Sequence, residues 1–172
     1  MSRAVMLSIR PKWVEKIANG EKTIEVRKTQ PKLETPFKCY IYCTLPKYPH
    51  EDFIATDYPM PQFYGGGKVV GEFTCDQIID AWWDYVPDAI TREVTGGNLE
   101  ALDGIGMTDE ELFSYVGDSM RGHCYGWHIS DLLIYDQPKG LDEFTRLRET
   151  KFGSEPVTIK RAPQSWCYVE EG

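Results

Sequence analysis

The sequence predicts an α+β fold that is mainly β: a small mixed β-barrel with a few short helices. Stretches rich in β-branched and aromatic residues recur far apart along the 172-residue chain, and we expect strands at residues 4–9, 22–28, 39–44, 68–75, 125–134 and 165–169. Helical signals are few, and strands do not alternate with helices as they do in parallel βαβ folds. A hydrophobic content of 41% at this length predicts one core and one domain over residues 1–172.

Two helices have local signals. Pro11 suits a first helical position, Gly20 lies just past the end, and the apolar residues between them share one helical face. A second helix is predicted to open at Thr108, because its hydroxyl can form a capping box with Glu111.

Two inserts interrupt the predicted strands. Residues 45–67 combine prolines, a run of three glycines and aromatic residues such as Tyr48, Phe53 and Tyr58. These rings could close over a ligand or stack on a base, although packing of the loop onto the barrel is the commoner case for any single ring. Residues 80–121 are expected to form mostly short helices.

The charge is uneven. The net charge of −8 argues against a protein that coats duplex nucleic acid, since that mode needs a broad basic surface. Residues 1–38 nevertheless carry nine Lys or Arg against four Glu, a balance of +5, which leaves −13 for the remainder. A positive segment on an acidic body suits a site for a few phosphates or one anionic ligand, but a solvated basic helix and loop would explain the charge equally well.

Composition also bears on compartment and cofactors. No run reaches the roughly 18 apolar residues of a membrane span, no signal peptide is apparent, and five cysteines without dense clustering suit free thiols. We therefore expect a cytoplasmic protein without a membrane partner. Cys39 and Cys43 are interpreted as buried hydrophobes, and His123, Cys124 and His128 as structural residues, so no metal and no cofactor is expected.

Residues 22–28 concentrate the candidate chemistry. Ile24 and Val26 alternate with Glu25 and Arg27, so a strand places Glu25 and Arg27 on one face, about 6 to 7 Å apart. Lys22 belongs to the other face unless it lies in the preceding turn.

This set can bind or catalyse. As a binding set, Arg27 offers a planar fork to a phosphate or base carbonyl, Lys22 a point charge, and Glu25 an acceptor for an exocyclic amine, which would select a cytosine-like or guanine-like edge. As a catalytic set, a desolvated Lys22 could lose its proton while Glu25 relays protons. Glu72 is a second candidate carboxylate, unless it simply faces solvent from its strand. The plainer alternative is a structural ion pair between Glu25 and Arg27.

The segment GEKTIEVR at residues 20–27 resembles the G-x-K-x-x-E-x-R signature of ASCH domains and lies, as in that family, after the first helix. Residues 161–168, RAPQSWCY, look like the ending of phage and prophage members. The resemblance implies a PUA-like β-barrel with a cleft beside the signature, and RNA or a modified nucleoside or nucleotide as partner. The expected binding set is then Lys22, Glu25 and Arg27, with Arg10 and Lys28 beside them.

One ASCH branch that this chain resembles in the signature is an amidohydrolase acting on N4-acetylcytidine. Its signature Lys matches Lys22, but its nucleophilic Thr falls at Glu25 and its distant Glu falls at Ile105. Without nucleophile and acid that route loses its chemistry. We therefore rank recognition of a nucleobase or RNA above hydrolysis of a modified nucleoside or RNA, in which Lys22, Glu25 and Glu72 would be the catalytic candidates. A third alternative is a phage-type accessory protein that binds another protein.

Overall fold

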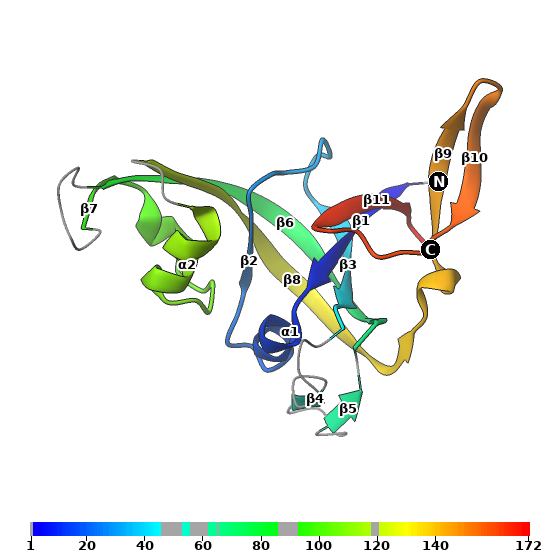
Figure 1. Cartoon of the computed structure of the whole chain (residues 1–172), viewed down its shortest axis with the longest axis horizontal. Helices are drawn as coiled ribbons and strands as arrows, with labels where there is room; N and C mark the ends of the chain where they lie inside the picture. The colour runs from blue at the N-terminus through cyan, green and yellow to red at the C-terminus, as the bar shows by residue number, and fades with distance from the viewer. Residues whose placement is uncertain (1, 46–52, 56–61, 65, 86–92, 118–120) are drawn as a thin grey trace.

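The protein is described here by a computed structural model that covers residues 2–45, 53–55, 62–64, 66–85, 93–117 and 121–172 (Figure 1). Two α-helices, two short 3-10 helices and a larger number of strands make up this part of the chain. In chain order they are β1 (Arg3–Ile9), α1 (Pro11–Ala18), β2 (Ile24–Arg27), β3 (Phe37–Cys43), β4 (Phe53–Ala55), β5 (Gln62–Tyr64), β6 (Lys68–Tyr85), β7 (Val94–Gly97), η2 (Leu99–Leu102), α2 (Asp109–Val116), β8 (Arg121–Lys139), η3 (Leu141–Glu143), β9 (Thr145–Thr150), β10 (Gly153–Thr158) and β11 (Trp166–Glu170).

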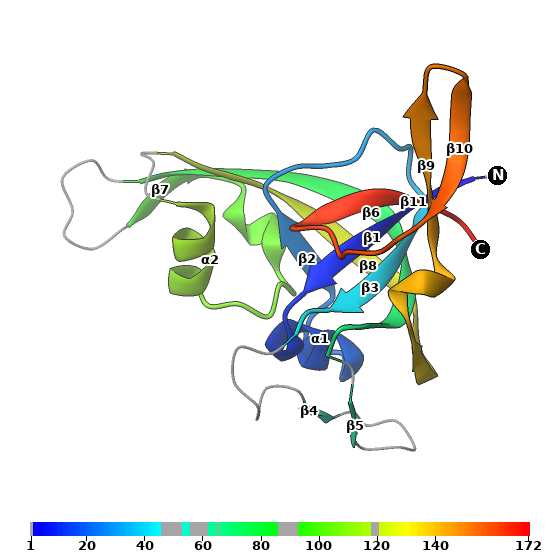
Figure 2. The same cartoon turned by 45° about the vertical axis from the view of Figure 1, so that its right-hand side comes forward.

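Seven of the described strands form one mixed sheet in the order β11-β1-β3-β6-β8-β2, with β7 added to β6. The pair β1 and β3 is parallel and the other ladders are antiparallel. The sheet curls until β2, at one end, approaches the start of β11, at the other (Figures 1 and 2). No backbone ladder joins these two ends within the described residues, so the barrel is incomplete. The predicted α+β, mainly β fold is confirmed.

The core explains why β1 reads as a continuous apolar run. Six of its seven residues are buried because both faces of the strand are covered. One face packs on the cluster that contains Trp127 and the α1 residues Val14 and Ile17, and the other on a cluster that contains Tyr40 and Phe144. A third cluster lies between α2 and the extended part of β6 and β8.

Helix α1 delivers the chain into β2. Pro11 stands in its first turn, and the helix ends at Ala18, after which Gly20 adopts a positive φ of 83°. The turn is then fixed to the loop at residues 104–106, because the Thr23 amide donates to the Gly104 carbonyl at 2.8 Å. The short strand β2 is thereby held at both sides, by β8 and by this loop.

The expectation that residues 80–121 form mostly short helices holds for part of the segment only, because both of its ends belong to strands. Strand β6 continues to Tyr85 and β8 begins at Arg121, so the two extend beyond the barrel as an antiparallel ribbon that β7 joins. Ala81 and Trp83 are buried while Asp80 and Trp82 are exposed, which is the period of two of a half-buried strand. Among the residues of this segment that the structure describes, 80–85, 93–117 and 121, the helices are η2 and α2, and the predicted capping box of Thr108 and Glu111 does open α2.

The first insert is described only in part. Within residues 45–67, β4 and β5 pair as an antiparallel two-stranded sheet. Tyr48 and Tyr58, on which the prediction of a ligand-covering loop partly depends, lie outside the described residues. No helix in the described part of the chain is long and apolar enough to cross a membrane.

Candidate functional site

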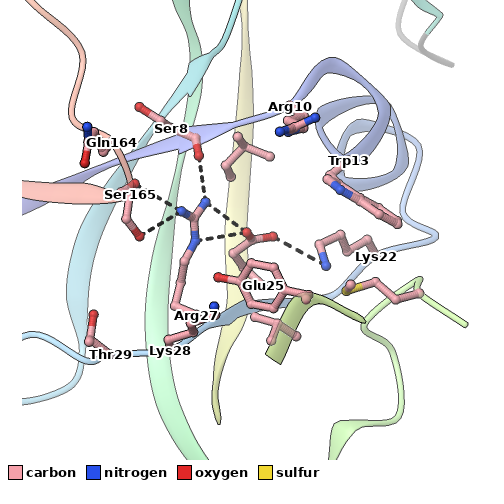
Figure 3. A pocket seen from close by; sticks show the side chains of 14 residues that line it. Ser8, Arg10, Trp13, Lys22, Glu25, Arg27, Lys28, Thr29, Gln164 and Ser165 are labelled. Carbon is pink, nitrogen blue, oxygen red and sulfur yellow. Dashed lines mark hydrogen bonds and ion pairs between the residues drawn. The ribbon is translucent and has the colours of Figure 1, made fainter. Parts of the chain in front are cut away.

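Lys22, Glu25 and Arg27 come together beside β2 (Figure 3). Strand alternation places the side chains of Glu25 and Arg27 on one face, where the Arg27 Nε lies 3.1 Å from the Glu25 Oε1. Lys22 lies in the turn before β2, and its Nζ lies 3.4 Å from the other carboxylate oxygen, Oε2. The turn therefore brings Lys22 to the side of β2 that carries its two partners.

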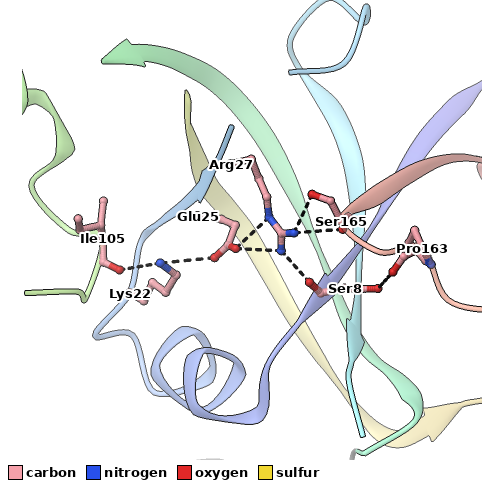
Figure 4. A network of polar contacts seen from close by, with 7 residues as sticks. All are labelled: Ser8, Lys22, Glu25, Arg27, Ile105, Pro163 and Ser165. Carbon is pink, nitrogen blue, oxygen red and sulfur yellow. Dashed lines mark hydrogen bonds and ion pairs between the residues drawn. The ribbon is translucent and has the colours of Figure 1, made fainter. Parts of the chain in front are cut away.

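Lys22 is held by the loop that follows η2. Its side chain is 2% exposed, and its Nζ donates to the Ile105 carbonyl at 2.6 Å (Figure 4). Gly106, in the same loop, has a positive φ of 67°, and a Cβ there would lie 3.1 Å from the Lys22 Cβ. Burial lowers the pKa of Lys22, and the Glu25 carboxylate opposes this shift.

Arg27 joins the two ends of the sheet (Figure 4). Its Nη1 donates to the carbonyl and hydroxyl oxygens of Ser165, at 3.1 and 3.2 Å, and its Nη2 donates to the Ser8 carbonyl at 2.8 Å. Nη2 also lies 3.0 Å from the Glu25 Oε1. Every guanidinium nitrogen thus has a protein partner. Arg27 therefore bridges the gap between β2 and the paired strands β1 and β11, where the described residues form no backbone ladder.

The two oxygens of Glu25 have partners of different strength. Its Oε1 accepts from Arg27, whereas its buried Oε2 has only the ion-pair contact with Lys22 and no well-aligned hydrogen bond from a described residue. A buried polar atom without a hydrogen bond is unfavourable by about 1 to 3 kcal/mol. The carboxylate is therefore held between two cations, and Oε2 is the oxygen with the weaker partner.

A cavity of about 480 Å³ lies against this cluster, a size common for small-molecule sites. Trp13, Met107 and Tyr115 provide apolar walls. The five candidate binding residues all line it, and the complete lining is Ser8, Ile9, Arg10, Trp13, Lys22, Glu25, Val26, Arg27, Lys28, Thr29, Met107, Tyr115, Gln164 and Ser165. Burial raises the pKa of the Tyr115 hydroxyl, which keeps that group a neutral hydrogen-bonding partner.

Glu72 does not share this cavity. Its carboxylate accepts from the Tyr135 hydroxyl at 2.6 Å, pairs with Lys38 at 3.3 Å, and lines a separate cavity beside Phe144. The expectation that Glu72 faces the cleft is wrong because its strand neighbour Phe73 fills the core on the side of Trp127, so alternation turns Glu72 to the opposite face.

His123, Cys124 and His128 lie on the ribbon of β6 and β8, away from this cavity. His123 pairs with Asp80 and His128 with Asp76 on the ribbon surface, while Cys124 is buried between them in sequence. Among the residues that the structure describes, no three His, Cys, Asp or Glu side chains are grouped closely enough to hold a metal ion.

Several lining residues were not predicted from the sequence. Trp13 was interpreted only as part of the apolar face of α1, although it lines the cavity with the Lys22 Nζ 5.4 Å from its ring. Ser165 contacts Arg27 through its carbonyl and its hydroxyl, and Ile105, which is outside the lining, holds Lys22 through its carbonyl; no side-chain pattern reveals such backbone contacts. The one available signal was the position of Ser165 in the RAPQSWCY segment.

No family model and no curated protein sequence matches this chain. Solved structures do. The ASCH protein of Zymomonas mobilis superposes with a TM-score of 0.52 at 16% identity, over 98% of this chain and 88% of that one. Two variants of it, one with a tyrosine replaced by phenylalanine and one with a serine replaced by alanine, give the same TM-score at 14% identity, over 98% of this chain and 91% and 89% of theirs. This chain therefore has the fold of the Zymomonas mobilis ASCH protein.

Proposed function

We propose that this chain is an ASCH-type, PUA-like domain, acting as one cytoplasmic unit, that recognises a nucleobase of RNA or of a modified nucleoside or nucleotide in the cavity beside Glu25. The observation that carries the proposal is the Glu25 carboxylate, which is held between Lys22 and Arg27 and belongs to a residue that lines a cavity of suitable size together with Trp13. We include in this proposal that the chain is a phage-type member of the family. The observation that supports this part is the RAPQSWCY segment at residues 161–168.

The chemistry of recognition follows from the carboxylate and the ammonium beside it. The Glu25 carboxylate would accept from an exocyclic amine, and the Lys22 ammonium would donate to a neighbouring carbonyl or ring nitrogen of the base. Trp13 offers an aromatic wall on which a base can stack. A donor next to an acceptor matches the edges of cytosine, adenine and guanine, so the arrangement favours these bases, which have an exocyclic amine, over uracil.

Arg27 has a different role in this proposal from the one that its sequence position suggested. Since its nitrogens are occupied by Glu25, Ser8 and Ser165, it acts on the ligand through Glu25, by fixing the orientation of the carboxylate. It is therefore a positioning residue rather than a direct phosphate ligand.

A hydrolase acting on a modified nucleoside or RNA is the second candidate, favoured by one observation. The pKa of the buried Lys22 is lowered, so its neutral form is more accessible for proton transfer than that of an exposed lysine. The hydroxyl groups nearby are engaged, however: the Ser8 hydroxyl donates to the Pro163 carbonyl at 2.6 Å, and the Ser165 hydroxyl accepts from Arg27. Incubation with N4-acetylcytidine and short RNAs tests this candidate, and turnover that Lys22→Ala abolishes would establish it.

The test of recognition uses Glu25→Gln, because glutamine has nearly the same shape but replaces one carboxylate acceptor with an amide donor. Calorimetric titration with cytidine, guanosine, uridine and adenosine should give measurable affinity for a base with an exocyclic amine, weakened by about tenfold or more in the variant. Glu21→Gln, an exposed neighbour outside the cavity, is the matched control. Equal affinity of the wild-type protein and the folded Glu25→Gln variant would remove the assignment of the site.

A further inference from the structure

We infer that the ligand of this cavity is a nucleotide with phosphate on both sides of its sugar, as in the interior of a single RNA strand, rather than a free nucleoside. The inference rests on the proposed function and adds the substrate class. It follows from two cations at the mouth of the cavity, Arg10 and Lys28, which stand on opposite sides of Glu25 (Figure 3).

The backbone of Arg10 is held by hydrogen bonds, whereas its side chain is available to a ligand. It lies between β1 and α1, where its carbonyl accepts from the amides of Trp13 and Val14, each at 3.0 Å. Its guanidinium is exposed, lines the cavity, and has no hydrogen bond or ion pair within the part of the chain that the structure describes. A planar fork without a partner at a cavity mouth suits a phosphate.

Lys28 occupies the other side, just after β2. Its Nζ lies 5.3 Å from the centre of the Tyr115 ring, so the aromatic wall holds the ammonium near the cavity without neutralising it. No carboxylate among the described residues pairs with it. Lys28 therefore offers a second anion contact, separated from the first by the carboxylate that would hold the base.

The other basic residues around the cavity are already engaged. Lys12 pairs with Glu111 at 3.1 Å, and Lys16 donates to the Gly106 carbonyl at 2.9 Å. The two unpaired cations thus mark two positions for anionic groups, not a general basic surface. A base inserted toward Glu25 leaves its sugar at the mouth, from which the 5′ and 3′ phosphates diverge, and this matches two separated cations better than one phosphate or none.

The experiment compares a nucleoside with its 5′-monophosphate, 3′-monophosphate and 3′,5′-bisphosphate, at one salt concentration, by calorimetry. The nucleoside is whichever of cytidine, adenosine and guanosine binds most tightly. The bisphosphate should bind at least about tenfold more tightly than the nucleoside, with each monophosphate in between. Arg10→Ala and Lys28→Ala should each lower this bisphosphate-to-nucleoside ratio, and each should remove the advantage of a different monophosphate. Lys32→Ala, an exposed cation outside the cavity lining, is the matched control and should leave the ratio unchanged.

The outcomes separate the two proposals. Glu25-dependent binding of the nucleoside, with no gain from either phosphate, overturns the inference and leaves the proposed function in place. A phosphate gain that is undiminished in both Arg10→Ala and Lys28→Ala overturns the assignment of these cations. Absence of binding by every nucleoside and nucleotide overturns the proposed function itself.

Discussion

Arg27 connects parts of the chain that are distant in sequence. Its partner Ser8 belongs to the first strand, β1, and its partner Ser165 directly precedes the last strand, β11. Its charge is balanced by Glu25, which Lys22 also contacts, so the cluster holds two buried cations and one carboxylate. A cluster of this kind specifies geometry more than it adds stability, since each ion loses its hydration. Loss of Arg27 should nevertheless lower the stability of the fold, because it leaves buried polar groups without a partner.

Replacement of Arg27 by alanine should lower the free energy of unfolding by about 3 to 5 kcal/mol, because it leaves the buried Glu25 without its main partner and the Ser8 and Ser165 carbonyls without a donor. Urea denaturation followed by tryptophan fluorescence measures this. Lys32→Ala, an exposed cation five positions later, should stay within about 0.5 kcal/mol of the wild type. Similar stability of Arg27→Ala and Lys32→Ala would contradict a role for Arg27 in closing the sheet.

The lowered pKa of Lys22 gives a prediction with a definite sign. The folded protein releases this proton at lower pH than the unfolded chain, whose reference pKa is 10.5, so the unfolded chain binds more protons between the two values. The free energy of unfolding contributed by Lys22 should therefore rise with pH across that window. Denaturation of wild-type protein and Lys22→Met at a series of alkaline pH values isolates this contribution as their difference. A difference that falls as the pH rises would mean that attraction to Glu25 outweighs desolvation.

At the scale of elements, the site depends on the short strand β2, which carries Glu25 and Arg27. Strand β2 has four residues, and its ladder with β8 sets Glu25 opposite Trp127 and Arg27 opposite Tyr125. Trp127 is fully buried, so the carboxylate stands beside a rigid part of the core. The opposite side of the cavity comes from α1 and from the Ile105 loop, which means that three elements must pack correctly for Glu25 and Lys22 to meet.

The ribbon of β6 and β8 depends on one close approach. Gly122 faces the Trp83 indole so closely that a Cβ at that position would lie 2.0 Å from the ring. Gly122→Ala should therefore displace Trp83, disturb the cluster under α2 and lower the free energy of unfolding by about 1 to 3 kcal/mol. Gly96→Ala on the neighbouring strand β7 is the control, since its nearest contact, the Asp84 Oδ2, would be at 3.6 Å. Chemical denaturation of the two variants should separate them, and equal effects would argue against this packing.

At the scale of the whole molecule, the sequence was informative where structure is local. Alternation predicted that Glu25 and Arg27 share a face, and the capping box predicted the start of α2. It failed where long-range packing decides. The segment that contains Trp82, Trp83, Tyr85 and Pro87 is predicted to be helical although β6 continues to Tyr85, and the face of Glu72 depended on which side of β6 packs against Trp127. The contacts of Arg27 with Ser8 and Ser165 could not be predicted, since only the curl of the sheet brings these distant residues near.

The distribution of charge predicts a weak and limited salt dependence of binding. The chain carries −8 overall although residues 1–38 carry +5, so an RNA strand that leaves the cavity meets a body that is mostly acidic.

If Arg10 and Lys28 contact one phosphate each, the logarithm of the affinity should fall against the logarithm of the salt concentration with a slope of about −1.4. Fluorescence anisotropy with labelled oligonucleotides of increasing length measures the slope. It should stay constant once a nucleotide has phosphate on both sides, because further phosphates find no unpaired cations at the cavity mouth. A slope that steepens with every added nucleotide would instead require a basic track along the surface, which is incompatible with two isolated phosphate contacts on an acidic protein.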